Sequence, residues 1–240
     1  MSDRPAQDAA HPPLGRELRE DTLGLLREAA AALRRHRWAF LAGAAAIVAA
    51  TCALWPHDPS ISRSFTTGRP PFWEDFAGGV RRWGAFTDTL VFCAAVYLAG
   101  LWRGRRAWRT AALAAFLAAS MAGLPANAVR LTTGRPRPRA NEADVFHGPT
   151  LVYKYQSFPS GHASASVGSA AALLSALPAA GLPALLSAGA VVWSSMYSRN
   201  HYATDVLVGS GVGALYGIAF GLGARRLRRG PGPPTPKEST

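Results

Sequence analysis

Six apolar blocks constrain the fold of this chain more than any other feature of its sequence. Each is close to the ~20 residues that a helix needs to cross the hydrocarbon core of a bilayer. Backbone polar groups must be satisfied inside a membrane, so such blocks predict helices. They cover residues 38–55, 85–102, 110–129, 163–180, 183–198 and 206–224. The sequence therefore predicts an all-α, polytopic membrane protein built as a six-transmembrane-helix bundle.

The segments outside these blocks divide the chain into three parts. Residues 1–37 are expected to form a cytoplasmic tail, disordered over residues 1–13 and favouring an amphipathic helix after them. Residues 38–224 would hold the six-span domain. Residues 225–240 are basic and rich in Pro, and they are expected to form a disordered cytoplasmic tail.

Small residues and prolines indicate how the predicted helices turn and pack. Gly181 and Leu182, between Pro178 and Pro183, are all that separates the fourth block from the fifth, which predicts a tight helical hairpin there. Glycines recur along the last block, at positions 209, 211, 213, 217 and 221. Such faces allow helices to approach closely, so we assign them packing and no chemistry.

The formal net charge of +12 raises the question of nucleic-acid binding. The basic residues lie mostly at the ends of apolar blocks, and no interleaved aromatic and basic motif is present, so we expect no nucleic-acid partner. Anionic lipid headgroups and the bilayer are the expected partners. With a cytoplasmic N-terminus, sixteen of the 26 Lys and Arg residues fall inside and ten outside. This bias predicts the orientation of the chain, and we expect an integral protein of a bacterial cytoplasmic membrane.

Three polar clusters lie at the ends of apolar blocks. They are Arg130–Arg139, Gln156–His162 and Ser194–Asp205. Counting spans places all three on the same membrane face, and the charge bias makes that face extracytoplasmic. Unpaired amides at a helix start bind anions, so the clusters predict one outward-facing phosphate site.

The first two clusters supply donors for a phosphate group. Guanidinium groups of Arg130 and Arg137 match phosphate oxygens. Amides around Ser160 and Gly161 add a backbone nest at the start of a helix. Arginines at the end of a span are often only interface anchors, but their coincidence with the other clusters favours a site.

The histidines supply a candidate nucleophile and a candidate acid. His201 is the candidate nucleophile, because Asp205, about one helical turn later, can accept its ring N–H and leave the other nitrogen unprotonated. His162 is the candidate general acid. Each of these histidines alone would more simply be a helix cap or a surface residue. No carboxylate–histidine cluster of the metal-ligand type is present, so the sequence predicts no metal and no cofactor.

With these residues the chain resembles the type 2 phosphatidic acid phosphatase superfamily of integral membrane lipid phosphatases. The signature of that family is Lys-x6-Arg-Pro, then Pro-Ser-Gly-His, then Ser-Arg-x5-His-x3-Asp. The matching residues are Arg137–Pro138, Pro159–His162, Ser194, His201 and Asp205. Two positions depart from the signature: Arg130 stands in place of Lys, and Ser195 in place of Arg.

The resemblance implies a phosphohistidine on His201, oriented by Asp205, with His162 protonating the leaving group. The residues implied in phosphate binding are Arg130, Arg137, Ser160 and Gly161. Ser195 removes a guanidinium from this set, which can cost roughly two to three orders of magnitude in rate. We expect Arg199 or Arg139 to replace it.

The expected function is metal-independent hydrolysis of a membrane lipid phosphate or diphosphate, such as undecaprenyl diphosphate, phosphatidate or phosphatidylglycerophosphate. Two alternatives stay open. The same first half-reaction serves a lipid phosphotransferase, and a degenerate relative would bind lipid phosphates without turnover. A transporter or channel is disfavoured, because the polar residues gather at one face and do not line the midplane.

Overall fold

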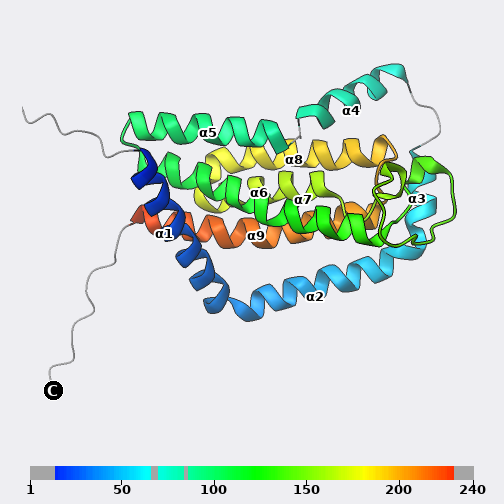
Figure 1. Ribbon diagram of the computed structural model, residues 1–240, viewed down its shortest axis with the longest axis horizontal. Coiled ribbons are helices and arrows are strands. Elements are labelled where there is room, and N and C mark those ends of the chain that lie inside the picture. The colour runs from blue at the N-terminus through cyan, green and yellow to red at the C-terminus, as the bar shows by residue number, and fades with distance from the viewer. Residues whose placement is uncertain (1–13, 66–69, 84–85, 230–240) are drawn as a thin grey trace, which may run out of the picture.

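The computed structural model describes residues 14–65, 70–83 and 86–229, and all regular structure in these residues is helical (Figure 1). The expectation of an all-α membrane protein is confirmed. Of the tails predicted to be disordered, residues 1–13 and 230–240 lie outside the described residues, whereas residues 225–229 are not disordered but continue the helix α9. The helices are α1 (Leu14–Arg35), α2 (Arg37–Leu54), α3 (Asp58–Ser64), α4 (Pro71–Trp83), α5 (Phe86–Trp102), α6 (Arg106–Thr133), α7 (Gly161–Ala176), α8 (Pro178–Tyr197) and α9 (Ala203–Arg229).

Each of the six apolar blocks forms a helix, namely α2, α5, α6, α7, α8 and α9. Within the described residues, four helical segments are long and apolar enough to cross a membrane, or five if α4 and α5 count as one bent span. These four contain α2, α6, α8 and α9. The helix α7 has only 16 residues.

Helix α7 lies at the centre of the bundle and packs against α6, α8 and α9. Its contact with α9 depends on glycines spaced four residues apart, at positions 209, 213, 217 and 221. A Cβ atom at Gly213 would lie 2.4 Å from the carbonyl oxygen of Ser164, and one at Gly217 would lie 2.5 Å from that of Gly168. The glycines therefore let the backbones of α7 and α9 touch, which is the packing role expected for them.

The hairpin between α7 and α8 is tighter than the sequence suggested. The turn lies at Leu177, and α8 begins at Pro178 and runs through Gly181 and Pro183. The amides of Ala180 and Gly181 both donate to the carbonyl oxygen of Leu177, at 3.0 Å. Proline is well suited to the first residue of a helix because it has no amide hydrogen to satisfy there, so Pro178 starts the helix.

The amphipathic helix expected in the N-terminal tail is α1, and it docks across one end of the bundle on α6 and α9 (Figure 1). The buried Asp21 accepts a hydrogen bond from the Tyr97 hydroxyl at 3.0 Å and pairs with Arg109 at 3.1 Å. Glu17 pairs with the same arginine at 2.7 Å. These contacts fix α1 at the end of the bundle opposite to the polar loops.

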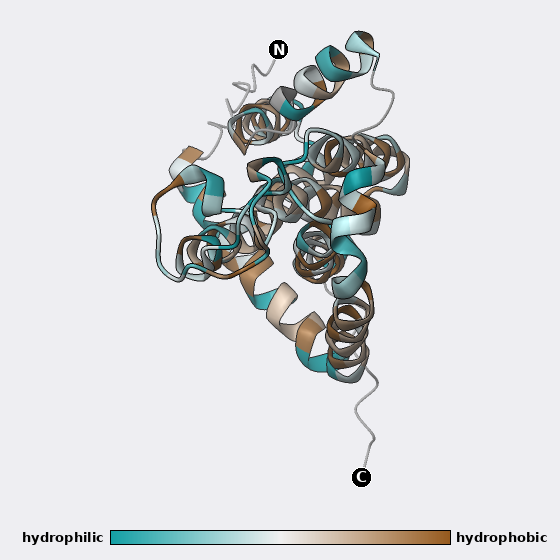
Figure 2. Cartoon of the chain, turned by 90° about the vertical axis from the view of Figure 1, so that its right-hand side faces the viewer, coloured by the Kyte–Doolittle hydropathy of each residue, from teal (hydrophilic) through white to brown (hydrophobic). Residues whose placement is uncertain are grey.

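The polar loops gather at the other end, where Figure 2 shows mainly hydrophilic residues in front of apolar helices. The loops between α6 and α7 and between α8 and α9 meet there. Helix α4 lies over this end and packs on α8, with the rings of Trp73 and Phe76 against Trp193 at centroid distances of 5.8 and 6.1 Å. The aromatic residues between α2 and α5 are thus carried in part by a helix.

Candidate active site

Hydrogen bonds join the three polar clusters at one end of the bundle. Nη1 of Arg137 donates to the carbonyl oxygen and Oδ1 of Asn200, both at 3.2 Å. The Ser157 hydroxyl donates to Oδ2 of Asp205 at 2.5 Å, and the Ser160 amide donates to the carbonyl oxygen of Asp205 at 3.0 Å. Segments far apart in the sequence therefore form a single site.

The start of α7 is held against α6. Ser160 is the N-cap residue, and its hydroxyl accepts a hydrogen bond from the Ala163 amide at 3.3 Å. Gly161 follows, and a Cβ atom there would lie 2.8 Å from Oδ1 of Asn127. A larger residue would require the Asn127 side chain to move, so the first turn of α7 lies directly beside the polar end of α6.

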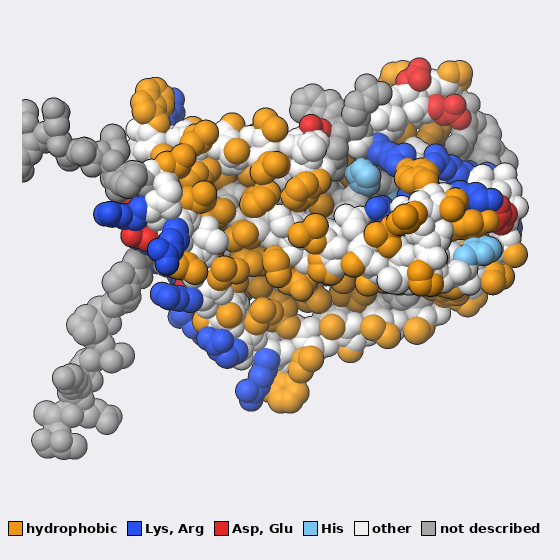
Figure 3. All heavy atoms as spheres, in the orientation of Figure 1, with side chains coloured by type: hydrophobic (Ala, Val, Ile, Leu, Met, Phe, Trp, Pro, Cys, Tyr) orange, Lys and Arg blue, Asp and Glu red, His pale blue; other side chains and the backbone are white. Residues whose placement is uncertain are grey.

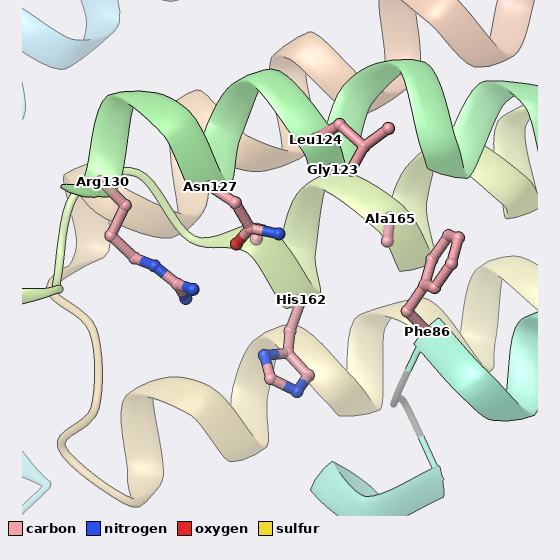
Figure 4. A pocket seen from close by; sticks show the side chains of 8 residues that line it. Phe86, Gly123, Leu124, Asn127, Arg130, His162 and Ala165 are labelled. Carbon is pink, nitrogen blue, oxygen red and sulfur yellow. The ribbon is translucent and has the colours of Figure 1, made fainter. Parts of the chain in front are cut away.

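A cavity of about 250 Å³ opens beside this first turn (Figure 4). Arg130 and Asn127 from α6 and His162 from α7 project into it. Nε of Arg130 is buried, and no hydrogen-bond partner for it is present among the described residues. Buried guanidinium nitrogens are rarely left without a partner, so this cavity is suited to an anion. The lining residues are Phe86, Gly123, Leu124, Asn127, Arg130, Gly161, His162 and Ala165.

His201 lies in the loop between α8 and α9, and its ring is buried. Its Nδ1 lies 2.7 Å from the carbonyl oxygen of Ser157. Because a carbonyl can only accept, Nδ1 carries the hydrogen and Nε2 keeps its lone pair in the neutral ring. Burial, together with the charge of Arg137, lowers the pKa of His201 well below its usual value. The ring is therefore neutral at pH 7, as a nucleophile requires.

Asp205 does not accept the ring hydrogen of His201 directly, in contrast to the expectation from the sequence. Its Oδ2 lies 3.9 Å from Nδ1 of His201. The carboxylate is already satisfied by the Ser157 hydroxyl, the Tyr202 amide at 2.7 Å and Nη1 of Arg135 at 2.7 Å. Asp205 thus holds the backbone on both sides of the histidine.

Arg135 is the site residue that the sequence did not single out. Its guanidinium is fully buried and pairs with three carboxylates, those of Asp58 at 2.9 Å, Asp144 at 2.6 Å and Asp205 at 2.7 Å. The rings of Trp55 and Tyr202 lie on it at 3.9 and 4.2 Å. Except for Asp144, these partners come from distant parts of the chain, so only the position of Arg135 within an arginine-rich cluster indicated its importance.

Arg137 is also buried, but its contacts differ in kind from those of Arg135. Its Nε donates to the carbonyl oxygen of Tyr153 at 3.0 Å, and its guanidinium lies 4.0 Å from the centroid of that ring. No hydrogen bond engages its Nη2 within the part of the chain that the structure describes. Arg137 is therefore fixed by neutral groups and keeps its charge unbalanced.

The two arginines expected to compensate for Ser195 lie elsewhere. Arg199 donates from Nη2 to the Pro138 carbonyl at 2.7 Å and to Oδ1 of Asn141 at 2.9 Å, so its guanidinium is held by the outer loop. Arg139 is exposed, 5.1 Å from the Tyr153 ring centroid. Neither lines the cavity beside His162. Ser195 is buried and donates to the Val191 carbonyl at 2.9 Å.

Among the residues that the structure describes, no group of three or more His, Cys, Asp and Glu side chains is arranged to hold a metal ion. The carboxylates near the site instead surround Arg135.

Comparisons with known proteins place the site within a recognised domain. A family model for the PAP2 superfamily matches residues 110–228, from α6 to the end of α9. A similar solved structure is the first transmembrane PAP2 type phosphatidylglycerolphosphate phosphatase from Bacillus subtilis, at 24% identity and a TM-score of 0.52. The match covers 80% of this chain and 94% of that one. A search of curated protein sequences gave no significant match.

Proposed function

The chain belongs to the PAP2 superfamily, and from this premise we propose that it removes phosphate from a membrane lipid phosphate or diphosphate without a metal ion. The observation that carries this proposal is the set of groups beside the start of α7. Two histidines, one with a free Nε2 lone pair, lie with Arg130 and Arg137, whose charges act on both rings. Donors of this kind stabilise the charge of a phosphoryl group during transfer.

The proposed reaction has two steps. First, Nε2 of His201 attacks phosphorus, the bond from phosphorus to the lipid-side oxygen breaks, and His162 gives its proton to that oxygen. Second, water attacks the phosphohistidine, His162 takes the proton of the water, and inorganic phosphate leaves. Arg130, Arg137 and the amides near Ser160 and Gly161 would hold the phosphoryl oxygens throughout.

A lipid substrate is supported by a second cavity of about 630 Å³. It lies between α5, α6, α7 and α8, and its lining is mainly apolar, with Phe92, Val96, Leu173 and Val191 among the contributors. Ala165 lines the first cavity and Ser166 the second, so both cavities border the first two turns of α7. Apolar chains would occupy the larger cavity while the phosphate enters the smaller one.

The lipid and the orientation are parts of the same proposal. Phosphatidylglycerophosphate is one candidate substrate, beside phosphatidate and undecaprenyl diphosphate, and the Bacillus subtilis structure is named for an activity on the first. We propose an outward-facing site in a cytoplasmic membrane, on the basis of the Lys and Arg bias of the loops. One observation favours an alternative: the absence of a guanidinium at Ser195 suits a protein that binds lipid phosphate without hydrolysing it.

The decisive experiment measures inorganic phosphate release in detergent micelles containing a chelator, from each of the three lipids. Native protein is compared with His201→Ala and with His36→Ala, a matched control whose exposed histidine lies between α1 and α2 and lines neither cavity. Chelator-resistant release that is lost only in His201→Ala supports the proposal. Release that requires a metal, or that persists in His201→Ala, contradicts it. Transfer of phosphate to an added lipid alcohol would identify a phosphotransferase.

A further inference from the structure

Arg81 lies at the edge of the candidate active site, although it belongs to none of the three polar clusters. It comes from α4, and its Nη2 donates to the Tyr153 hydroxyl at 2.7 Å. Tyr153 also contacts Arg137, through its ring and through its carbonyl. The charge of Arg81 acts on His162, on Arg130 and on Arg137. A single tyrosine therefore links Arg81 to Arg137, and the charge of Arg81 acts on Arg130 and His162, which line the cavity.

The pKa of Tyr153 is consistent with this placement. Burial works to raise the pKa of the phenol, but the charge of Arg137 and the hydrogen bond and charge of Arg81 outweigh burial and lower it. The guanidinium of Arg81 is thus held by Tyr153 at the exposed edge of the site. Figure 3 shows Lys and Arg side chains gathered beside a histidine below α4.

The surroundings of these arginines distinguish them from Arg135. Arg135 is neutralised by three carboxylates. In the described ranges, by contrast, no carboxylate pairs with Arg81, Arg130 or Arg137. Positive groups that repel one another without a counterion require a compensating anion to be stable together. Their fork geometry matches the oxygens of a phosphate.

Helix α4 packs on α8, the helix that carries Ser195 at the position where the family signature has an arginine. Trp193 of α8 is the residue on which α4 packs, and it lies two residues before Ser195. Ser195 itself is buried and its hydroxyl is used within α8. The element that covers this part of α8 therefore carries a cation that α8 lacks.

We propose that Arg81 binds the phosphoryl group of the substrate together with Arg130 and Arg137, and so supplies the guanidinium that Ser195 cannot. The inference rests on the proposed function in that the anion is taken to be a lipid phosphate. Arg81 lies outside the residues matched by the family model, so it is a feature of this chain beyond that match.

The test uses Arg81→Gln and Arg81→Lys in the full chain. Arg105→Gln is the matched control, because it removes the same charge from an exposed arginine before α6. Two quantities are measured: kcat/KM for phosphate release from the lipids above, and the dissociation constant of orthovanadate, which mimics the transferring phosphoryl group. Thermal unfolding of each variant checks that it is folded.

We expect Arg81→Gln to lower kcat/KM by about 100-fold to 1,000-fold, the usual effect of removing one preorganised donor. Vanadate binding should weaken by at least about tenfold, with a smaller loss in Arg81→Lys because charge remains without the fork. Arg105→Gln should stay within about threefold of native. If Arg81→Gln fails to fold, weaker vanadate binding in Arg81→Lys is the deciding result.

Two outcomes separate this inference from the proposed function. In the first outcome the native chain is active, and Arg81→Gln and Arg81→Lys stay within about threefold of native in both quantities. That result overturns the role of Arg81 and leaves the proposed phosphatase function standing. An inactive native chain overturns the phosphatase, and vanadate binding in native and Arg81→Gln protein then decides the role of Arg81. Equal binding, or no binding by the native chain, rejects it.

Discussion

Asp205 lies beside His201 without accepting its ring hydrogen, because the Ser157 carbonyl oxygen, 2.7 Å from Nδ1, takes that place and Oδ2 of Asp205 stays 3.9 Å away. The carboxylate instead holds the Ser157 hydroxyl and the Tyr202 amide. Asp205 therefore acts on the histidine through the backbone that carries and contacts it. The orientation of His201, the proposed nucleophile, thus depends on Ser157, which lies just before the Pro-Ser-Gly-His motif.

Ser157→Ala should lower kcat. The change removes the hydrogen bond from Ser157 to the Asp205 carboxylate, and the Ser157 carbonyl that orients His201 is then no longer held in place. A hydrogen bond to a charged group contributes about 1.5–3 kcal/mol, so we expect a loss of about tenfold or more with the chain still folded. Phosphate release and thermal unfolding are the measurements. The matched control is Ser120→Ala, whose hydroxyl bonds only within α6 at 2.9 Å and lines neither cavity. Unchanged kcat in Ser157→Ala would show that Asp205 positions the ring by another route.

The pH dependence of kcat/KM should report the lowered pKa of His201. Burial first, and the charge of Arg137 second, disfavour the protonated ring, so the neutral nucleophile persists as pH falls below the ordinary value of 6.5. The acidic limb attributable to His201 should therefore lie below pH 6.5. Arg137→Gln removes a repelling charge and should move this limb upward, measured on its residual activity. Arg105→Gln, at the far end of α6, should leave it in place, and an equal shift in both variants would contradict the assignment.

Arg135→Met should destabilise the chain more than any other single change at this end of the bundle. It leaves three carboxylates, those of Asp58, Asp144 and Asp205, without the cation that neutralises them. Breaking a buried ion pair in this way costs about 3–5 kcal/mol of unfolding free energy. Thermal unfolding in detergent measures the loss, and Arg139→Met, at an exposed arginine, is the control. A small change in stability would mean that these carboxylates are protonated in the native state.

Gly213→Ala should destabilise the bundle, whereas Gly189→Ala should not. The new Cβ at Gly213 would lie 2.4 Å from the Ser164 carbonyl oxygen and would push α9 away from α7. Nothing lies within 4 Å of a Cβ at Gly189, so there the alanine gains only helix propensity, about 0.5–1 kcal/mol. Unfolding temperatures compare the two variants. Equal effects would refute direct backbone contact between the two helices.

Much of the fold could be predicted because its determinants are local. The lengths of the apolar blocks define α2, α5, α6, α7, α8 and α9, since a helix satisfies its own backbone and needs only a run of suitable residues. The turn between α7 and α8 was misplaced because both prolines are compatible with a helix start and the packing against α7 selects Pro178. The meeting of the three distant polar clusters was predictable by counting the spans, because successive spans end on alternate faces of the membrane.

The sequence by itself therefore determined the membrane bundle, the end at which the polar clusters meet and the identity of His162 and His201 as the groups to test. Only the tertiary structure decided which side chains complete the site. The roles of Ser157, Arg135 and Arg81 depend on contacts between residues about 50 to 80 positions apart, such as the 2.7 Å bond from Arg81 to Tyr153. No local pattern encodes such contacts, because they arise from the way α4 and the loops pack over the ends of α6, α7 and α9.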